Sequence, residues 1–198
     1  MKSDSLPLLS QTPIAWAHAV LAEPIALLID HAFLERKAAN NALELMTKWP
    51  GNHVPGWVET MTAVARDEAA HLSQVTRLLA RRGGTLERVH KNPYANELRQ
   101  LVRKGENGEV LDRLFVSALI EARSCERFGV LAAVADEELA KFYNALYSSE
   151  LGHYKVFLKL AARIAGRKNA DARWQEMLTA EADILARQEP GPRIHSGT

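Results

Sequence analysis

The chain has 198 residues and a mass of 22.0 kDa, with 47% hydrophobic and 25% charged residues, which is ordinary for one globular domain and excludes a disordered or membrane protein. The 25 basic and 24 acidic residues leave a formal net charge of +1, so nucleic-acid binding would have to depend on local basic clusters. Cys125 is the only cysteine, which excludes a disulfide framework and a cysteine-based metal site. No secretory signal pattern opens the chain, and we expect a cytoplasmic protein.

Helical periodicity runs through nearly the whole chain, and no segment predicts a convincing strand. Proline and glycine mark the ends of the expected helices. A short helix begins at Thr12 and Pro13 within residues 1–23, and longer ones cover about 24–49, 55–83, 109–134, 136–166 and 169–188. The connection from Gly84 to Gly108 is too long for a hairpin turn and contains another short helix, from Asn92 to about Lys104. We expect residues 1–198 to form one domain, with a four-helix bundle over 24–166 and a mobile tail over 190–198.

The two halves of the chain repeat one another. Each half has a helix with one glutamate in its apolar stripe, followed by a helix with a Glu-x-x-His motif. The two motifs align without a gap, and Gly84 in the first half then falls on Gly166 in the second. The repeated positions are Glu35, Glu68 and His71 in the first half and Glu121, Glu150 and His153 in the second.

These residue types at this spacing predict a metal centre. Residues at i and i+3 share a helix face, so the glutamate and the histidine of each motif reach one point in the core. Four buried carboxylates would repel one another, whereas two divalent cations cancel their charge. One glutamate from each of two helices, with Glu-x-x-His from each of the other two, is typical of di-iron carboxylate bundles. We therefore predict an all-α, ferritin-like four-helix bundle with one long crossover and peripheral helices, holding two iron ions. Glu68 and His71 bind one ion, Glu150 and His153 bind the other, and Glu35 and Glu121 complete the set.

A simpler interpretation is that these glutamates form ion pairs with Arg36, Arg66 or Arg123, but it would not explain the repeat. A third Glu-x-x-His pair, Glu87 and His90, lies in the crossover without a partner in the repeat, and we expect it at the surface.

Two further residues lie close to the predicted ligands in sequence. His31 precedes Glu35 by one turn, and Cys125 follows Glu121 by one turn. His31 either makes a hydrogen bond to one of the ligands or is an ordinary core or surface histidine. Cys125 either contacts one of the ligands from behind or is a packing residue near the site.

Three segments carry a family resemblance, which covers nearly the whole chain. Residues 27–39 (LLIDHAFLERKAA), 66–71 (RDEAAH) and 149–154 (SELGHY) together resemble the bacterial tRNA hydroxylases that act on 2-methylthio-isopentenyl-adenosine. The resemblance implies a non-haem di-iron monooxygenase that uses O2 to hydroxylate the isopentenyl group of this nucleoside, next to the anticodon. It also implies that the partners are tRNA and an electron-donor redox protein. A membrane and DNA are not expected as partners.

Basic residues near the end of the second long helix and in the crossover are candidates for tRNA binding: Arg77, Arg81, Arg82, Arg88, Lys91, Arg99, Arg103 and Lys104. The alternative for each cluster is that its positive charges stabilise the C-terminus of a helix.

Two other functions stay open. One is iron storage or peroxide detoxification, as in ferritins and rubrerythrins, although no Cys-x-x-Cys motif supports a rubrerythrin. The other is a metal-free RNA-binding bundle, which would leave the repeated ligands unexplained.

Overall fold

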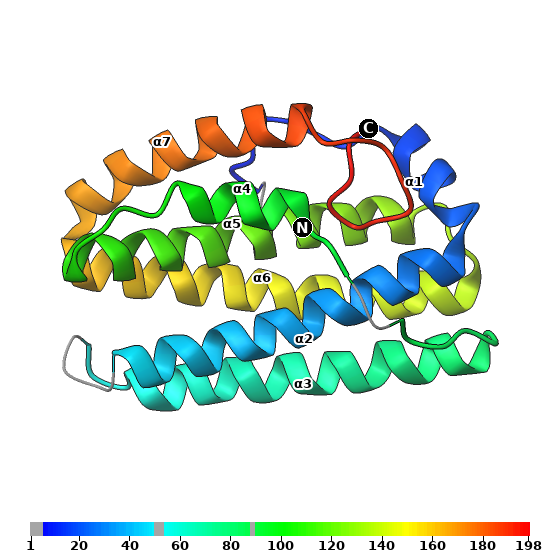
Figure 1. Ribbon diagram of the computed structural model, residues 1–198, viewed down its shortest axis with the longest axis horizontal. Coiled ribbons are helices and arrows are strands. Elements are labelled where there is room, and N and C mark those ends of the chain that lie inside the picture. The colour runs from blue at the N-terminus through cyan, green and yellow to red at the C-terminus, as the bar shows by residue number, and fades with distance from the viewer. Residues whose placement is uncertain (1–5, 50–53, 88–89) are drawn as a thin grey trace. The chain divides into compact units, whose positions relative to one another are not determined.

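The computed structural model describes residues 6–49, 54–87 and 90–198, and within these ranges every helix or strand is an α-helix (Figure 1). The helices are α1 (Ile14–Leu21), α2 (Pro24–Lys48), α3 (Trp57–Arg81), α4 (Pro93–Gln100), α5 (Glu106–Ala132), α6 (Glu137–Ala165) and α7 (Arg167–Ala186). The prediction of an all-α chain is therefore confirmed. Among these helices, none is by itself long and apolar enough to cross a membrane, and only the bent pair of α1 and α2 passes jointly, by length and composition.

Local sequence explains where the helices begin and end. Pro24 occupies the first turn of α2, where its missing N–H and fixed φ cost nothing. The Asp136 side chain accepts a hydrogen bond from the Leu139 backbone N–H at 3.0 Å and caps α6. Gly166 separates α6 from α7 with a φ of 75°, in the left-handed region that favours glycine. Observed and predicted ends differ by a few residues, as at α5, which begins at Glu106.

Contacts within the chain group it into two compact units. Unit 1 consists of Met1–Ala19, Pro93–Gly191 and His195–Thr198, and unit 2 consists of Val20–Asn92 and Pro192–Ile194. Each unit contains one long helix pair, which corresponds to one half of the sequence repeat. That residues 1–198 form one domain stays a prediction.

Unit 2 is built on α2 and α3, which lie side by side along their length (Figure 1). Their apolar stripes form its core, with Leu28, Ala32, Ala42 and Leu45 from α2 and Trp57, Met61, Val64, Val75 and Leu79 from α3. Burying such side chains contributes about 1.5–3 kcal/mol for each large one. Glu35 and Glu68 are also buried, in the middle of these apolar faces.

Unit 1 is built on α5 and α6, which pack along each other, while α4 and α7 contact α5. Two buried acidic residues connect the outer helices to this pair. Glu181 on α7 accepts hydrogen bonds from Arg123 Nε at 2.9 Å and from the Tyr94 hydroxyl at 2.9 Å. Asp112 on α5 accepts hydrogen bonds from Arg103 and Arg173 at 2.8 to 3.0 Å. These contacts hold α7 and the segment that precedes α5 in place.

The prediction of a mobile tail over 190–198 is wrong. Ile194, His195 and Ser196 are buried. Within unit 2, the Ile194 backbone N–H donates to Asp30 Oδ2 at 2.8 Å. Within unit 1, Ser196 Oγ lies 3.0 Å from Trp16 Nε1, which donates to it, and the His195 ring packs at 4.7 Å from the Tyr94 ring. The tail is ordered because its polar groups find partners on segments far away in the sequence.

The surface position expected for the Glu87 and His90 pair is correct for Glu87, which is exposed, and wrong for His90. The His90 side chain is 8% exposed, and its Nε2 lies 2.6 Å from Asp30 Oδ1. Its ring stacks on Phe33 with centroids 4.9 Å apart. Asp30 and Phe33 on α2 therefore hold the crossover in place at His90.

Candidate metal centre

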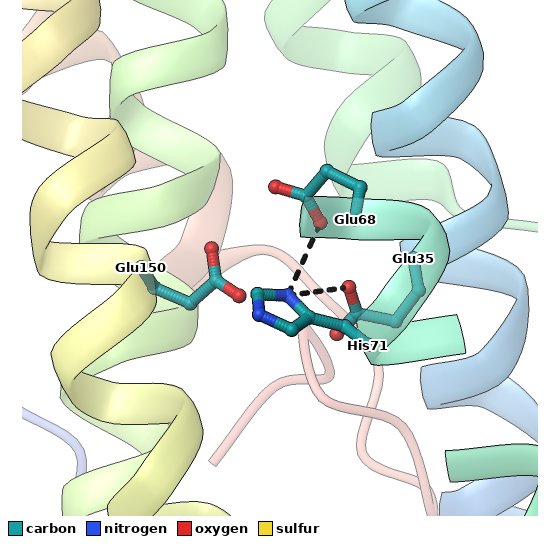
Figure 2. Close-up of side chains that lie close together, drawn as sticks. All are labelled: Glu35, Glu68, His71 and Glu150. Carbon is teal, nitrogen blue, oxygen red and sulfur yellow. Dashed lines mark ion pairs between the residues drawn. The ribbon is translucent and has the colours of Figure 1, made fainter. Parts of the chain in front are cut away.

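Three buried side chains of unit 2 meet on the facing sides of α2 and α3. Glu35 comes from α2, and Glu68 and His71 come from consecutive turns of α3. His71 Nδ1 lies 3.5 Å from Glu35 Oε2 and 3.6 Å from Glu68 Oε2, as the dashed lines in Figure 2 show. Each residue offers one ligand atom, and these atoms lie within 4.8 Å of one another. We call this group the unit 2 half-site.

A fourth buried side chain contacts the unit 2 half-site from the same helix as Glu35. His31 is 0% exposed, and its Nε2 lies 2.6 Å from Glu35 Oε1. From the sequence, two interpretations of His31 stayed open, and the i, i+4 spacing on α2 was the only signal for this contact. What His31 does toward a metal stays a prediction.

The second half of the repeat forms an equivalent group in unit 1. Glu121 comes from α5, and Glu150 and His153 come from α6. All three are buried, His153 Nδ1 lies 3.1 Å from Glu150 Oε2, and the ligand atoms of the three residues lie within 4.8 Å of one another. We call this group the unit 1 half-site.

Cys125 lies one turn beyond Glu121 and is fully buried. Its Sγ donates a hydrogen bond to the Tyr147 carbonyl oxygen at 3.4 Å. Burial, with the charge of Glu150 as a second cause, raises the pKa of the Cys125 thiol to about 12. The thiol is therefore protonated at neutral pH, which suits a packing residue better than a metal ligand or a nucleophile.

The donor set of each half-site suits a divalent cation. Two carboxylates and one imidazole, all buried, carry two negative charges when the histidine is neutral, and a divalent ion would cancel them. Mixed carboxylate and imidazole ligands match iron or manganese.

The three arginines that could have formed ion pairs with the glutamates have other contacts. Arg66 pairs with Asp67, Arg123 pairs with Glu181 and Glu126, and the Arg36 guanidinium lies over the Phe33 ring.

The candidate tRNA-binding residues differ in what surrounds them. Arg77, Arg81, Lys91, Arg99, Arg103 and Lys104 are exposed and Arg82 is half-buried. Arg88 lies outside the described residues. Arg103 has a structural contact, because its guanidinium and its backbone N–H both donate to Asp112. Sequence periodicity gave no signal for this pairing, which depends on the turn before α5.

Comparison with known proteins identifies the family. The family model described as tRNA-(MS[2]IO[6]A)-hydroxylase (MiaE) matches residues 3–196, which is nearly the whole chain. The chain belongs to this family. This result confirms the resemblance seen in the sequence.

Two proteins that are similar in sequence to this chain carry the same name, tRNA 2-(methylsulfanyl)-N(6)-isopentenyladenosine(37) hydroxylase. The protein of Pseudomonas putida is 43% identical over 187 residues, covering 94% of this chain and 90% of the relative. The protein of Salmonella typhimurium is 34% identical over 140 residues, covering 71% of this chain and 52% of the relative.

A solved structure is also similar to the MiaE-family chain. It is described as protein 43 with aldehyde deformylating oxygenase activity from Synechococcus, and it is 34% identical with a TM-score of 0.90, covering 96% of each chain. This likeness over nearly the whole chain confirms the predicted ferritin-like fold.

Proposed function

We propose that this MiaE-family protein is a non-haem di-iron monooxygenase that hydroxylates the isopentenyl group of 2-methylthio-isopentenyl-adenosine in tRNA, next to the anticodon. The observation that carries the proposal is the match of the family model to residues 3–196, with the two Glu/His half-sites buried inside the matched region. The reaction consumes the substrate C–H bond, O2, two electrons and two protons. It yields the hydroxylated nucleoside and one water molecule.

The residues proposed to hold the metal are Glu35, Glu68 and His71 in the unit 2 half-site and Glu121, Glu150 and His153 in the unit 1 half-site. Two iron ions, when bound, would pass electrons from an external donor to O2 and supply the oxidising power for the hydroxylation. The four carboxylates balance the charge of two divalent ions. Their burial excludes bulk water, which protects a reactive centre from side reactions.

The proposed substrate sets requirements that the chain can meet. A modified base in an anticodon loop is single-stranded and can be turned outward into a binding site. Exposed basic residues such as Arg77, Arg81 and Lys91 in unit 2 would contact the phosphates. The reaction also requires an external electron donor, for which we propose a redox protein. Since tRNA is the substrate, we place the protein in the cytoplasm.

Mass spectrometry of tRNA nucleosides tests this function. We expect the prenylated, methylthiolated adenosine to gain one oxygen atom in cells that contain the protein and to lack it in cells without the gene. The purified, iron-loaded protein with a chemical reductant and O2 should produce the same change in tRNA isolated from the deletion strain. If the nucleoside gains no oxygen atom after incubation with the fully iron-loaded protein, reductant and O2, the proposal is contradicted.

A second candidate activity is aldehyde deformylation, which the similar solved structure favours. Such a reaction would combine an aldehyde R–CHO with O2, four electrons and four protons to give R–H, formic acid and water. Formate release from a long-chain aldehyde, measured with the same loaded protein and reductant, separates the two activities. The match to a tRNA hydroxylase has the higher identity, 43% against 34%, and favours the tRNA reaction.

Iron storage, the other function left open by the sequence, requires a large hollow shell. A mass measurement of the protein in solution tests this alternative. A particle of many copies that retains far more than two irons per chain would favour storage.

A further inference from the structure

One exposed face of α6 in unit 1 carries a row of positive charges. Steps of three or four residues along the helix place five exposed residues on this face: Ser148, Gly152, Lys155, Lys159 and Arg163. We call this row the α6 basic face. Arg167 and Lys168 follow at the start of α7 and are also exposed. Of the three acidic residues of α6, Glu150 is buried, and Glu137 and Glu138 lie in the first turn, at the other end of the helix.

The uncharged end of the α6 basic face lies on the outer side of the turn that carries two proposed metal ligands. Glu150 and His153 of that turn are buried, whereas Ser148 and Gly152 are exposed. A Cβ at Gly152 would meet no atom within 4 Å, so the space outside it is open. A protein that docks here would be separated from the buried ligands by little more than the thickness of one helix, about 10 Å.

The equivalent face of α3 has a different charge pattern. The alignment of the two Glu-x-x-His helices, which has no gap, places Arg66 at the position of Ser148. Asp67 falls at the position of Ser149. Asp67 forms an ion pair with Arg66 at 2.9 Å, and its side chain is 40% exposed. An acidic partner would therefore meet a carboxylate next to the ligand turn of α3, whereas the equivalent positions of α6 are both serines.

A positively charged face outside the ligand turn fits the delivery of electrons better than the delivery of substrate. Figure 1 shows α6 as one unbroken helix, from Glu137 to Ala165, so a nucleoside cannot pass through it to the buried ligands. An electron can cross a helix by tunnelling, and the proposed hydroxylation takes two electrons from an external donor. Electron-transfer complexes have small interfaces, and opposite charges on the two surfaces speed their association.

We propose that the α6 basic face is the docking surface for an acidic one-electron carrier of the ferredoxin class. The proposal rests on the di-iron function proposed above and specifies where its electron donor binds. Each docking delivers one electron, so two reduced carriers dock in turn for each hydroxylation and leave oxidised. The lysines and the arginine attract the acidic carrier, and the open position at Gly152 allows it to approach the ligand turn.

Fluorescence anisotropy with a labelled, acidic [2Fe–2S] ferredoxin and the full-length protein, metal-free and iron-loaded, tests the proposal. Lys159→Glu combined with Arg163→Glu should weaken ferredoxin binding at low salt about tenfold, because two attractive charge pairs become repulsive. Arg77→Glu combined with Arg81→Glu is the matched control, since these exposed residues occupy the aligned positions of α3. It changes the net charge equally and should have a much smaller effect. Lys159→Arg combined with Arg163→Lys keeps both charges and should bind like the wild type.

The outcomes separate the docking surface from the function on which it rests. The docking surface is refuted if the wild type does not bind ferredoxin, if both charge reversals weaken binding alike, or if the reversal in α6 has no effect. Loss of tRNA binding with intact ferredoxin binding in the α6 variant would assign this face to tRNA phosphates instead. In each case, tRNA hydroxylation by the wild type with a chemical reductant would leave the proposed function standing. Its absence from the iron-loaded wild type would overturn the function itself.

Discussion

At the residue scale, six buried side chains are the metal ligands that we propose. Glutamate is rarely buried, yet four glutamates lie buried on largely apolar helix faces. Each half-site places a histidine beside two of them, with His153 3.1 Å from Glu150 and His71 3.5 Å from Glu35. Such groups would be costly as a purely structural feature, which is why we interpret them as metal ligands.

Glu150→Ala and Glu87→Ala form a matched pair that tests this interpretation. Both glutamates belong to a Glu-x-x-His motif, but Glu150 is 2% exposed and Glu87 is exposed on the crossover. We expect Glu150→Ala to abolish stable loading of two irons per chain and to remove hydroxylation, because one of four charge-balancing carboxylates is lost. Glu87→Ala should leave the iron content unchanged.

Thermal melts of the same variants distinguish metal binding from folding. Alanine has a high helix propensity, and removal of a buried carboxylate relieves repulsion in the metal-free protein. The metal-free Glu150→Ala protein should therefore melt at the same temperature as the wild type or higher. If Glu87→Ala removed the iron while Glu150→Ala kept it, the alignment of the two halves would be wrong.

At the scale of elements, Asp112 ties α5 to α7 and to the turn before α5. Its side chain is 0% exposed and accepts hydrogen bonds from both Arg103 and Arg173. Burial alone would raise the pKa of Asp112, but the hydrogen bonds from the two arginines outweigh it and hold the pKa below its ordinary value. Because the folded pKa is the lower one, the resulting stability is present above about pH 4 and disappears as the pH falls through the folded pKa.

Asp112→Asn measures this contribution. We expect the free energy of unfolding at pH 7 to fall by about 1–3 kcal/mol, because two charged donors lose an ionised acceptor. The difference between variant and wild type should shrink as the pH falls below about 4. Urea unfolding at pH 7 and at a pH below about 4 provides the measurement. Asp67→Asn, at an exposed pair with Arg66, is the control and should change the stability by less than about 1 kcal/mol. An equal loss for both variants would refute the structural role of Asp112.

Gly197 provides a test of the tail as an ordered element. A Cβ at this position would lie 1.8 Å from the Gln188 carbonyl oxygen, and the Gly197 N–H donates to Glu189 O at 3.0 Å. Gly197→Ala should therefore displace residues 195–198 and remove the hydrogen bond between Ser196 and Trp16. We expect faster digestion by carboxypeptidase and a change in tryptophan fluorescence. Gly108→Ala, whose Cβ would meet its nearest atom at 3.6 Å, is the control and should leave the tail protected.

For the whole molecule, the formal net charge of +1 means that no global field attracts tRNA. Binding would depend on local phosphate contacts, which release counterions whatever the net charge is. We expect tRNA affinity to fall steeply between about 50 and 200 mM salt. Fluorescence anisotropy with labelled tRNA measures the slope.

Variants of single basic residues refine this test. Arg81→Ala removes an exposed cation at the end of α3 and should reduce the salt slope by about one if Arg81 contacts a phosphate. Arg103→Ala should reduce stability as well, because Arg103 pairs with Asp112. A flat salt dependence in the wild type would mean that these residues are only solvated helix ends.

Much of this protein was determined by its sequence alone. Helical periodicity, prolines and glycines located the long helices, because the periodicity and the capping of a helix depend on neighbours a few residues away. The Glu-x-x-His spacing put each pair of side chains on one face for the same reason. The internal repeat identified Glu35 and Glu121 as members of the same set. Local geometry and a duplicated pattern were sufficient for these predictions.

Only the tertiary structure decided the contacts between residues far apart in the chain. The burial of Ile194 and Ser196, the pairing of His90 with Asp30, and the pairing of Asp112 with Arg173 join segments separated by 60 residues or more. No periodicity encodes such contacts, because they depend on how helices pack. Even His31, at a permitted spacing from Glu35, could have turned to either of two roles. Its side-chain rotamer in the buried core places Nε2 2.6 Å from Glu35 Oε1.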